Sequence, residues 1–314
     1  MTDLSVRLGP LTLKNPLVAA SGTFGFGCDY GDILPPETFG AVIVKGTSMQ
    51  PWSGNPPPRI FETPSGMLNA IGLENPGVRE VMEVHLPSLL RRDTAVIVNV
   101  VGRTVDEYAA VARELSAVAG LAALELNISC PNVAAGGMGF GTCPDTAARL
   151  VSSVREVTDL PLLVKLTPNV TDIAALARSV ERAGADVISL INTLAGMEID
   201  VESERPVLGN VFGGLSGPAI RPVALRCVWN VYDAVGIPLL GLGGVCSHRD
   251  VLAFMLAGAS AVGMGTALFS DPSLPGRILR QLSEYRRSGR DWPVGRAHEE
   301  GERDEGGRSH HCRP

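Results

Sequence analysis

The sequence has no long apolar run and no extended basic block. No stretch of its 314 residues reaches the roughly 18 consecutive apolar residues needed to cross a bilayer, and residues 1–10 carry no signal-peptide core. We therefore expect a soluble, cytoplasmic protein. The formal net charge is -6, and no part of the body of the chain concentrates positive charge, which argues against a nucleic-acid partner.

Closely spaced cysteine pairs are also missing. The chain has six cysteines, and the closest two, Cys130 and Cys143, are 13 residues apart. This spacing argues against an iron–sulfur or zinc site made by this chain alone, and a disulfide framework is not expected at this length. His310, His311 and Cys312 belong to a polar tail that would not fix a metal geometry, so we predict no metal.

What the sequence does have is a recurring pattern of short apolar runs. They are rich in Val, Ile and Leu without strict alternation, which is typical of parallel strands covered on both faces. The eight runs are Pro16–Ala20, Ala41–Lys45, Ala95–Val100, Ala123–Ser129, Leu162–Leu166, Val187–Asn192, Pro238–Gly243 and Ala261–Gly265.

Helical patterns lie between many of these runs. They cover Val105–Val118, Asp145–Val157, Asp172–Ala183 and Arg249–Ala257, with Thr104 and Thr171 as expected N-caps. Eight strands alternating with helices favour an α/β fold of the TIM (β/α)8 barrel type. The alternative is an open doubly wound sheet, whose usual G-x-G-x-x-G loop does not occur here.

We expect one barrel domain over residues 1–287 and a charged, disordered tail over residues 288–314. Leu4–Leu13 reads as a hairpin that turns at Gly9 and Pro10 and closes the bottom of the barrel. Residues 46–94 and 193–237 are longer than a simple connection requires, and we expect these long loops to build or cover the active site.

In such a barrel the chemistry lies at the carboxyl ends of the strands. Lysine within an apolar run is rarely buried without a partner or a function, so Lys45 and Lys165 are interpreted as functional. Gly243 and Gly244 at the end of the seventh strand, and Gly265 at the end of the eighth, let backbone N–H groups approach an anion closely, which favours a phosphorylated cofactor such as FMN. The lysines would then face its ring.

Cys130 directly follows the fourth strand, in the polar segment Asn127-Ile128-Ser129-Cys130-Pro131-Asn132. A thiol at a barrel mouth can act as a general base or a nucleophile. The sequence offers it no obvious histidine partner, since His85 and His248 fall in a helical region or at a helix start, so a Cys–His hydrolase is disfavoured.

This catalytic segment resembles that of the class 1 dihydroorotate dehydrogenases. The resemblance covers roughly residues 4–285, and two segments, Ser21–Gly27 and Ala70–Asn75, are similar to class 1B, the NAD-linked form. Further motifs that resemble this family are Gly54–Arg59, Glu62–Pro64, Asn69–Leu73, Ile191–Leu194, Gly213–Pro218 and Gly243–Val245.

The resemblance implies that Cys130 is the base that deprotonates dihydroorotate while hydride passes to FMN. The residues implied to hold the substrate are Lys45, Asn69, Ala70, Ile71, Gly72, Leu73, Asn127, Asn192 and Thr193. Those implied to contact FMN are Ser21, Lys45, Gly46, Asn99, Asn127, Lys165, Ile191, Gly217, Gly243, Gly244, Gly265 and Thr266.

The same resemblance implies a partner subunit with FAD and a [2Fe–2S] cluster that passes electrons to NAD+, in a heterotetramer built on a dimer of barrels. The chain departs from the family pattern at Ala134, Ala135, Ala195 and Glu198. Two alternatives stay open at this stage: a fumarate-linked enzyme that acts without a partner, and a flavin-binding scaffold without activity.

Overall fold

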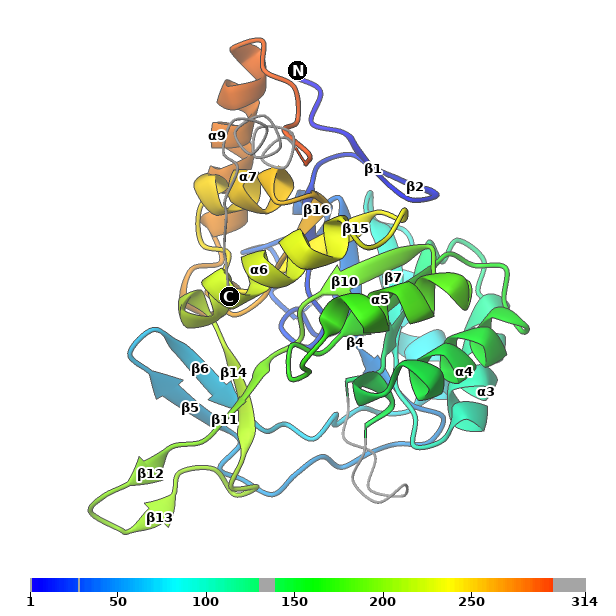
Figure 1. Ribbon diagram of the computed structural model, residues 1–314, viewed down its shortest axis with the longest axis vertical. Coiled ribbons are helices and arrows are strands. Elements are labelled where there is room, and N and C mark those ends of the chain that lie inside the picture. Colours follow the sequence, from blue (N-terminus) through cyan, green and yellow to red (C-terminus); the bar gives the residue numbers. More distant parts are fainter. Residues whose placement is uncertain (1, 28, 130–138, 296–314) are drawn as a thin grey trace, which may run out of the picture.

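Eight parallel strands close into a barrel in the order β10-β15-β16-β3-β4-β7-β8-β9 (Figure 1). The computed structural model describes residues 2–27, 29–129 and 139–295. Each predicted apolar run coincides with one barrel strand, which confirms the TIM-barrel prediction. The strands are β3 (Leu17–Ala19), β4 (Ala41–Thr47), β7 (Ala95–Val100), β8 (Ala123–Asn127), β9 (Leu162–Leu166), β10 (Val187–Leu190), β15 (Leu239–Leu242) and β16 (Ala259–Met264).

Helices cover the outside of the barrel, and their apolar faces pack on the strands. The longer ones are α3 (Val105–Ser116), α4 (Pro144–Arg155), α5 (Ile173–Arg182), α6 (Arg221–Tyr232), α7 (His248–Leu256) and α9 (Leu274–Arg287). The connection from β4 to β7 contains α1 (Val78–Glu80), the π-helical η2 (Val81–His85) and α2 (Leu86–Leu89). Single helical turns among the described residues are η1 (Pro36–Thr38), η4 (Phe140–Thr142), η5 (Pro218–Ile220) and α8 (Ala267–Ser270).

Of the two predicted N-cap residues, one is confirmed and the other is wrong. The Thr104 side chain accepts a hydrogen bond from the Glu107 N–H and so caps α3 as predicted. The prediction of Thr171 for α5 was wrong, because the Asp172 carboxylate accepts from the Ala175 N–H and the helix begins one residue later, at Ile173. Both oxygen-bearing side chains suit the position, and the carboxylate also complements the positive end of the helix dipole.

The amino-terminal hairpin closes the end of the barrel opposite to the strands' carboxyl ends. β1 (Val6–Leu8) pairs with β2 (Leu11–Leu13) around the predicted turn, and β1 packs against β16. Leu8 and Leu13 are fully buried there. The hairpin therefore plugs the bottom with apolar side chains and leaves the mouth as the open end.

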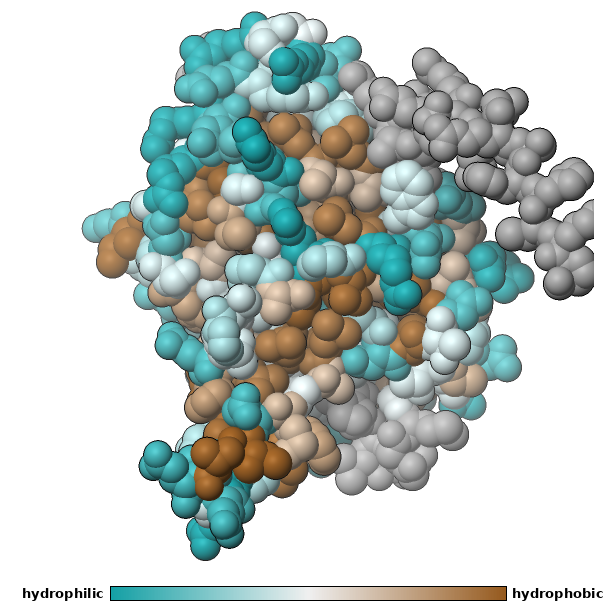
Figure 2. Space-filling view, turned by 60° about the vertical axis from the view of Figure 1, so that its left-hand side comes forward, coloured by the Kyte–Doolittle hydropathy of each residue, from teal (hydrophilic) through white to brown (hydrophobic). Residues whose placement is uncertain are grey.

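Both long insertions meet in an arm beside the mouth. β5 (Ile60–Thr63), β6 (Gly66–Asn69), β14 (Gly213–Ser216) and β11 (Leu194–Gly196) form one antiparallel sheet, and the pair β12 (Ile199–Asp200) and β13 (Arg205–Pro206) extends it. The arm is at the lower left of Figure 1, and Figure 2 shows apolar side chains gathered near its tip. Ile199, Val201 and Phe212 are exposed there.

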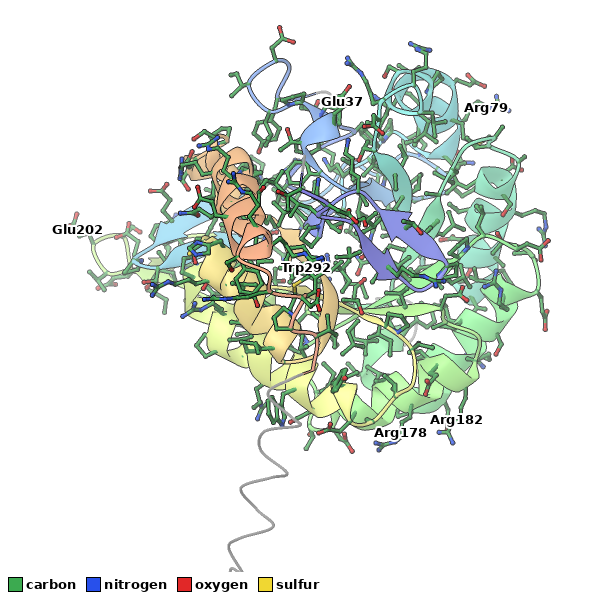
Figure 3. The ribbon with its side chains drawn as sticks, turned by 90° about the horizontal axis from the view of Figure 1, so that it is seen from above. Glu37, Arg79, Arg178, Arg182, Glu202 and Trp292 are labelled. Atoms are coloured by element: carbon green, nitrogen blue, oxygen red, sulfur yellow. The ribbon has the colours of Figure 1, made fainter. Side chains whose placement is uncertain are left out.

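The ordered body extends past the predicted domain boundary at residue 287. The Trp292 indole N–H donates to the Ser5 carbonyl at 3.2 Å and stacks on Tyr285, and the Gly295 N–H donates to the Met255 carbonyl at 2.9 Å. Figure 3 shows Trp292 between α9 and the amino-terminal strands. Residues 292 and 295 therefore still pack on the barrel, and residues 296–314 of the predicted tail lie outside the described residues. None of the described helices is long and apolar enough to span a membrane.

Trp292→Ala is expected to lower the free energy of unfolding by about 1 to 3 kcal/mol, because it removes a half-buried ring and its hydrogen bond. Trp292→Phe keeps a ring on Tyr285 and should cost only about 1 kcal/mol, the worth of the lost N–H bond. Urea unfolding followed by far-UV circular dichroism measures both. An alanine variant as stable as wild type would show that the Trp292 side chain contributes nothing to the stability of the fold.

Candidate active site

Every barrel strand brings a predicted site residue to the same mouth. These residues lie within the last turns of the strands or directly after them, as the strand-end argument predicts. In strand order they are Ser21, Lys45 with Gly46, Asn99, Asn127, Lys165, Ile191 with Asn192 and Thr193, Gly243 with Gly244, and Gly265 with Thr266.

Lys165 reaches across the barrel. Its strand, β9, is four places from β3 in the ring of eight, so the two strands face each other. The Lys165 ammonium nevertheless donates to the Ser21 hydroxyl, directly after β3, at 3.4 Å. The residue is only 5% exposed. No ion pair joins this ammonium to a carboxylate in the described part of the chain, so a buried cation lies in the floor of the mouth.

Amide side chains line the neighbouring part of the mouth. The Asn192 amide N–H donates to Asn127 Oδ1 at 3.2 Å and to Ser129 Oγ at 2.9 Å, and Ser129 donates to the Lys165 carbonyl at 3.2 Å. The hydroxyl of Tyr108, from α3, donates to the Asn127 carbonyl at 2.6 Å. These hydrogen bonds connect the ends of β8, β9 and β10. The connected residues include Ser129, which directly precedes Cys130 in the sequence.

The arm brings the predicted substrate residues to the mouth. The Asn69 amide donates to the Gly214 carbonyl at 3.1 Å, and Gly214 lies so close to Thr193 that any side chain at 214 would collide with its hydroxyl. Ala70 is buried, and its N–H donates to the Arg59 carbonyl at 2.8 Å. Gly214 therefore brings Asn69 and Thr193, which are far apart in the sequence, to the same side of the mouth.

Residues 70–73 are held by a contact that the sequence reasoning did not single out. The Arg59 guanidinium pairs with the Glu74 carboxylate at 2.5 Å and donates to the carbonyls of Asn55 and Ser53. Leu73, next to Glu74, has a left-handed backbone with φ of +56°. The ion pair holds this uncommon turn beside the mouth.

Asn99 presents an acceptor that no described group satisfies. Its Oδ1 is buried without a hydrogen-bond partner among the described residues. It lies beside Gly46, where an added Cβ would be 3.1 Å from it and 3.7 Å from Leu73 Cδ2. A buried acceptor of this kind needs a donor, and a flavin ring N–H would supply one. The site thus fits the predicted cofactor on this point.

The seventh and eighth strands end in a cluster that suits a phosphate. Gly244 has φ of +73°, and an added Cβ there would lie 2.7 Å from the Gly217 carbonyl and 3.0 Å from the Arg221 N–H nitrogen. The Thr266 hydroxyl donates to Ser216 at 2.8 Å on the same side. Backbone glycines and a hydroxyl therefore meet near the amino terminus of α6, an arrangement that favours an anion.

Two buried carboxylates at the site were missed by the sequence reasoning. Asp250 is 2% exposed and accepts from the Arg221 guanidinium, the Cys246 N–H and the Ser247 hydroxyl, which fixes the loop after β15. Glu125 is fully buried in the barrel and pairs in register with Asn99 on the neighbouring strand. An acidic residue inside the apolar run Ala123–Ser129 is a signal of the same kind as Lys165 within its run.

Several predicted features cannot be located or lie away from the mouth. Cys130, Ala134 and Ala135 lie outside the described residues. Ala195 and Glu198 are exposed on the arm, where Glu198 borders a surface hollow of ≈ 270 Å³ that none of the predicted strand-end residues lines. These two departures therefore concern the arm.

The chemistry available at the mouth follows from its groups. One buried ammonium, a second lysine at Lys45, several amides and a hydroxyl can bind a small, planar, anionic ring with amide groups. The fixed cation stabilises negative charge that develops next to it. A thiol, predicted at residue 130, would add a base.

The comparisons with known proteins agree with this geometry. The model of the family described as dihydroorotate dehydrogenase matches residues 3–285. Relatives named dihydroorotate dehydrogenase B (NAD(+)), catalytic subunit, include one from Geobacter sp. (strain M21), 54% identical over 90% of this chain and 93% of its own. Others are from Desulforudis audaxviator (55%, 90% and 92%) and Anoxybacillus flavithermus (52%, 90% and 90%). The chain belongs to the dihydroorotate dehydrogenase family.

Proposed function

We propose that this chain is the FMN-bearing catalytic subunit of an NAD-linked dihydroorotate dehydrogenase. It oxidises (S)-dihydroorotate to orotate in pyrimidine (UMP) biosynthesis. The observation that carries the proposal is the mouth itself, where the buried Lys165 ammonium spans the barrel beside the linked amides of Asn127 and Asn192. The names of the relatives support the same activity.

The substrate matches the donors and acceptors of the mouth. Dihydroorotate has a carboxylate, for which Lys45 provides a cation, and two ring amide groups, which amide side chains can pair in both directions. We assign these contacts to Asn69, Asn127, Asn192 and Thr193, with the backbone of residues 70–73 closing the wall.

The reaction removes a hydride from the ring carbon that carries the carboxylate and a proton from the neighbouring CH2 group, which is next to a carbonyl. FMN, when bound, accepts the hydride and thus both electrons. We assign Cys130 as the base that takes the proton. The polar group of Ser129, Asn192 and Lys165 fixes the point from which the Cys130 segment leaves β8.

Our proposal gives the cofactor two sets of contacts. Lys165, Asn99, Gly46 and Ser21 lie where they would hold its ring, and Lys165 would stabilise negative charge there. For its phosphate we propose the glycines and hydroxyl at the ends of β15 and β16. The residues of that second set are Gly217, Gly243, Gly244, Gly265 and Thr266, with Ile191 beside them.

The proposal needs a second subunit to reach NAD+. The chain has neither a G-x-G-x-x-G loop nor a close cysteine pair. The relatives' names include both NAD(+) and the term catalytic subunit, which favours a partner over the fumarate-linked alternative. We propose that the partner carries FAD and a [2Fe–2S] cluster, in a cytoplasmic heterotetramer built on a dimer of barrels.

The isolated chain, loaded with FMN, is expected to be bleached by dihydroorotate but to reduce NAD+ at only a few per cent of the rate reached with the partner. Absorbance of the flavin and of NADH, measured in the same anaerobic sample, separates the two steps. Fumarate in place of NAD+ is the matched control. Rapid NAD+ reduction by the pure single chain would refute the need for a partner, and rapid fumarate turnover would favour the alternative. A yellow protein that dihydroorotate does not bleach would indicate a scaffold without activity.

A further inference from the structure

Glu125 is a carboxylate inside the barrel, two residues before Asn127 at the mouth and in register with Asn99. It lies in the middle of β8 and is 0% exposed. Its Oε1 accepts from the Asn99 amide N–H at 2.7 Å, and its Oε2 accepts from the Ser189 hydroxyl at 2.9 Å. It forms no ion pair within the described ranges. A fully buried glutamate is rare and needs both oxygens satisfied, which these two bonds achieve.

The bond from Asn99 determines which way its amide faces. The side chain has one donating and one accepting end, so an N–H that donates to Glu125 turns the carbonyl away from it. That carbonyl, Asn99 Oδ1, is the buried acceptor without a partner beside Gly46. Because Gly46 has no side chain, nothing of residue 46 covers this acceptor at the mouth.

We propose that Glu125 is a positioning residue. It holds the Asn99 amide so that Oδ1 accepts a hydrogen bond from an N–H of the flavin ring, and it does not itself touch the cofactor. The inference rests on the proposed FMN binding and adds a requirement to it. If a residue that cannot accept a hydrogen bond replaces Glu125, the Asn99 amide can turn over. Its N–H would then face the N–H of the flavin ring, and two donors cannot form a hydrogen bond.

FMN affinity tests the proposal, measured by the quenching of flavin fluorescence as FMN is added back to the deflavinated chain. Glu125→Gln keeps an oxygen for Asn99 and can donate to Ser189, so its Kd should stay within about threefold of wild type. Glu125→Met, of similar length, removes the acceptor and should raise Kd about tenfold or more, the scale of one misdirected hydrogen bond. Glu125→Asp withdraws the carboxylate by one methylene and should resemble Met, which keeps the test decisive if the Met variant does not fold.

A double-mutant cycle distinguishes positioning from a general loss of packing. In the Asn99→Ala background, the Met or Asp change at 125 should raise Kd no further, because its effect acts through Asn99. An additive loss, or an unchanged Kd in the Met or Asp single variant, would overturn the inference while leaving the proposed function intact. A wild-type chain that does not bind FMN would overturn both.

Discussion

Cys130→Ser is expected to slow the reduction of bound FMN by dihydroorotate by about 10² to 10⁴ near neutral pH, the usual worth of a general base. A free thiol has a pKa of about 8.5, and a serine hydroxyl ionises only at far higher pH, so serine is much the poorer base. FMN should stay bound, since serine is close to cysteine in size and every residue assigned to the cofactor is unchanged.

The pH dependence adds a second signature. As the pH rises through the thiol pKa, more of the wild-type enzyme carries the thiolate, so its rate of flavin reduction should rise and then level off. The serine variant should show no such rise in this range. Stopped-flow reduction with excess dihydroorotate, followed between about pH 6 and 10 around the thiol pKa of about 8.5, records both profiles.

Cys143→Ser is the matched control, because Cys143 is the cysteine nearest to Cys130 in the sequence. Hydrogen bonds from the backbone N–H groups of Thr146 and Asp145 hold the pKa of Cys143 below its usual value. Its replacement should leave the rate within a few-fold of wild type. If Cys143→Ser lowers the rate of flavin reduction strongly and Cys130→Ser lowers it little, the base is Cys143 and not Cys130.

Lys165→Ala is expected to slow flavin reduction by about 10² to 10³, the scale found when one fixed electrostatic stabiliser is removed. Lys165 is buried, and its ammonium meets Ser21 from the opposite strand, so the charge is held in place before the reaction begins. The ammonium therefore stabilises the negative charge that develops on the flavin during hydride transfer, and it does not have to move to do so. FMN binding should weaken as well.

Lys14→Ala provides the comparison for this variant. Lys14 is a surface lysine paired with Asp93 at 2.8 Å, and losing such a pair costs little. FMN content, the stopped-flow rate and thermal unfolding are measured on both variants, so that a loss of folding is not mistaken for a loss of chemistry. Unchanged FMN content with an unchanged rate in Lys165→Ala would remove this lysine from the assigned role.

The barrel could be predicted because its strands are buried on both faces. Val, Ile and Leu therefore follow one another without a polar break, as in Ala95–Val100, and each run is visible locally. The sheet of the arm gave no such signal. Its strands are short, half-exposed and rich in glycine, as in Gly213–Ser216, and the Asn69–Gly214 contact joins residues 145 positions apart.

The candidate site could be predicted residue by residue but not as a network. Strand ends identify Asn127, Lys165 and Asn192, because a parallel barrel brings all carboxyl ends together. The order of the strands around the ring, which puts Lys165 opposite Ser21, requires the closed structure. Glu125 stands in its apolar run as Lys165 does, but its partners Asn99 and Ser189 lie on other strands, and only the closed barrel brings the three side chains together.

The distribution of lysine has a practical consequence for attaching the protein to a surface. The chain has 27 lysines and arginines, of which only Lys14, Lys45 and Lys165 are lysines. Lys165 is buried and Lys45 half-buried at the mouth, whereas Lys14 is exposed directly after the hairpin that plugs the opposite end. Among the side chains, amine coupling should therefore select Lys14 and leave the mouth facing the solution, in one orientation suited to measuring the docking of a partner subunit.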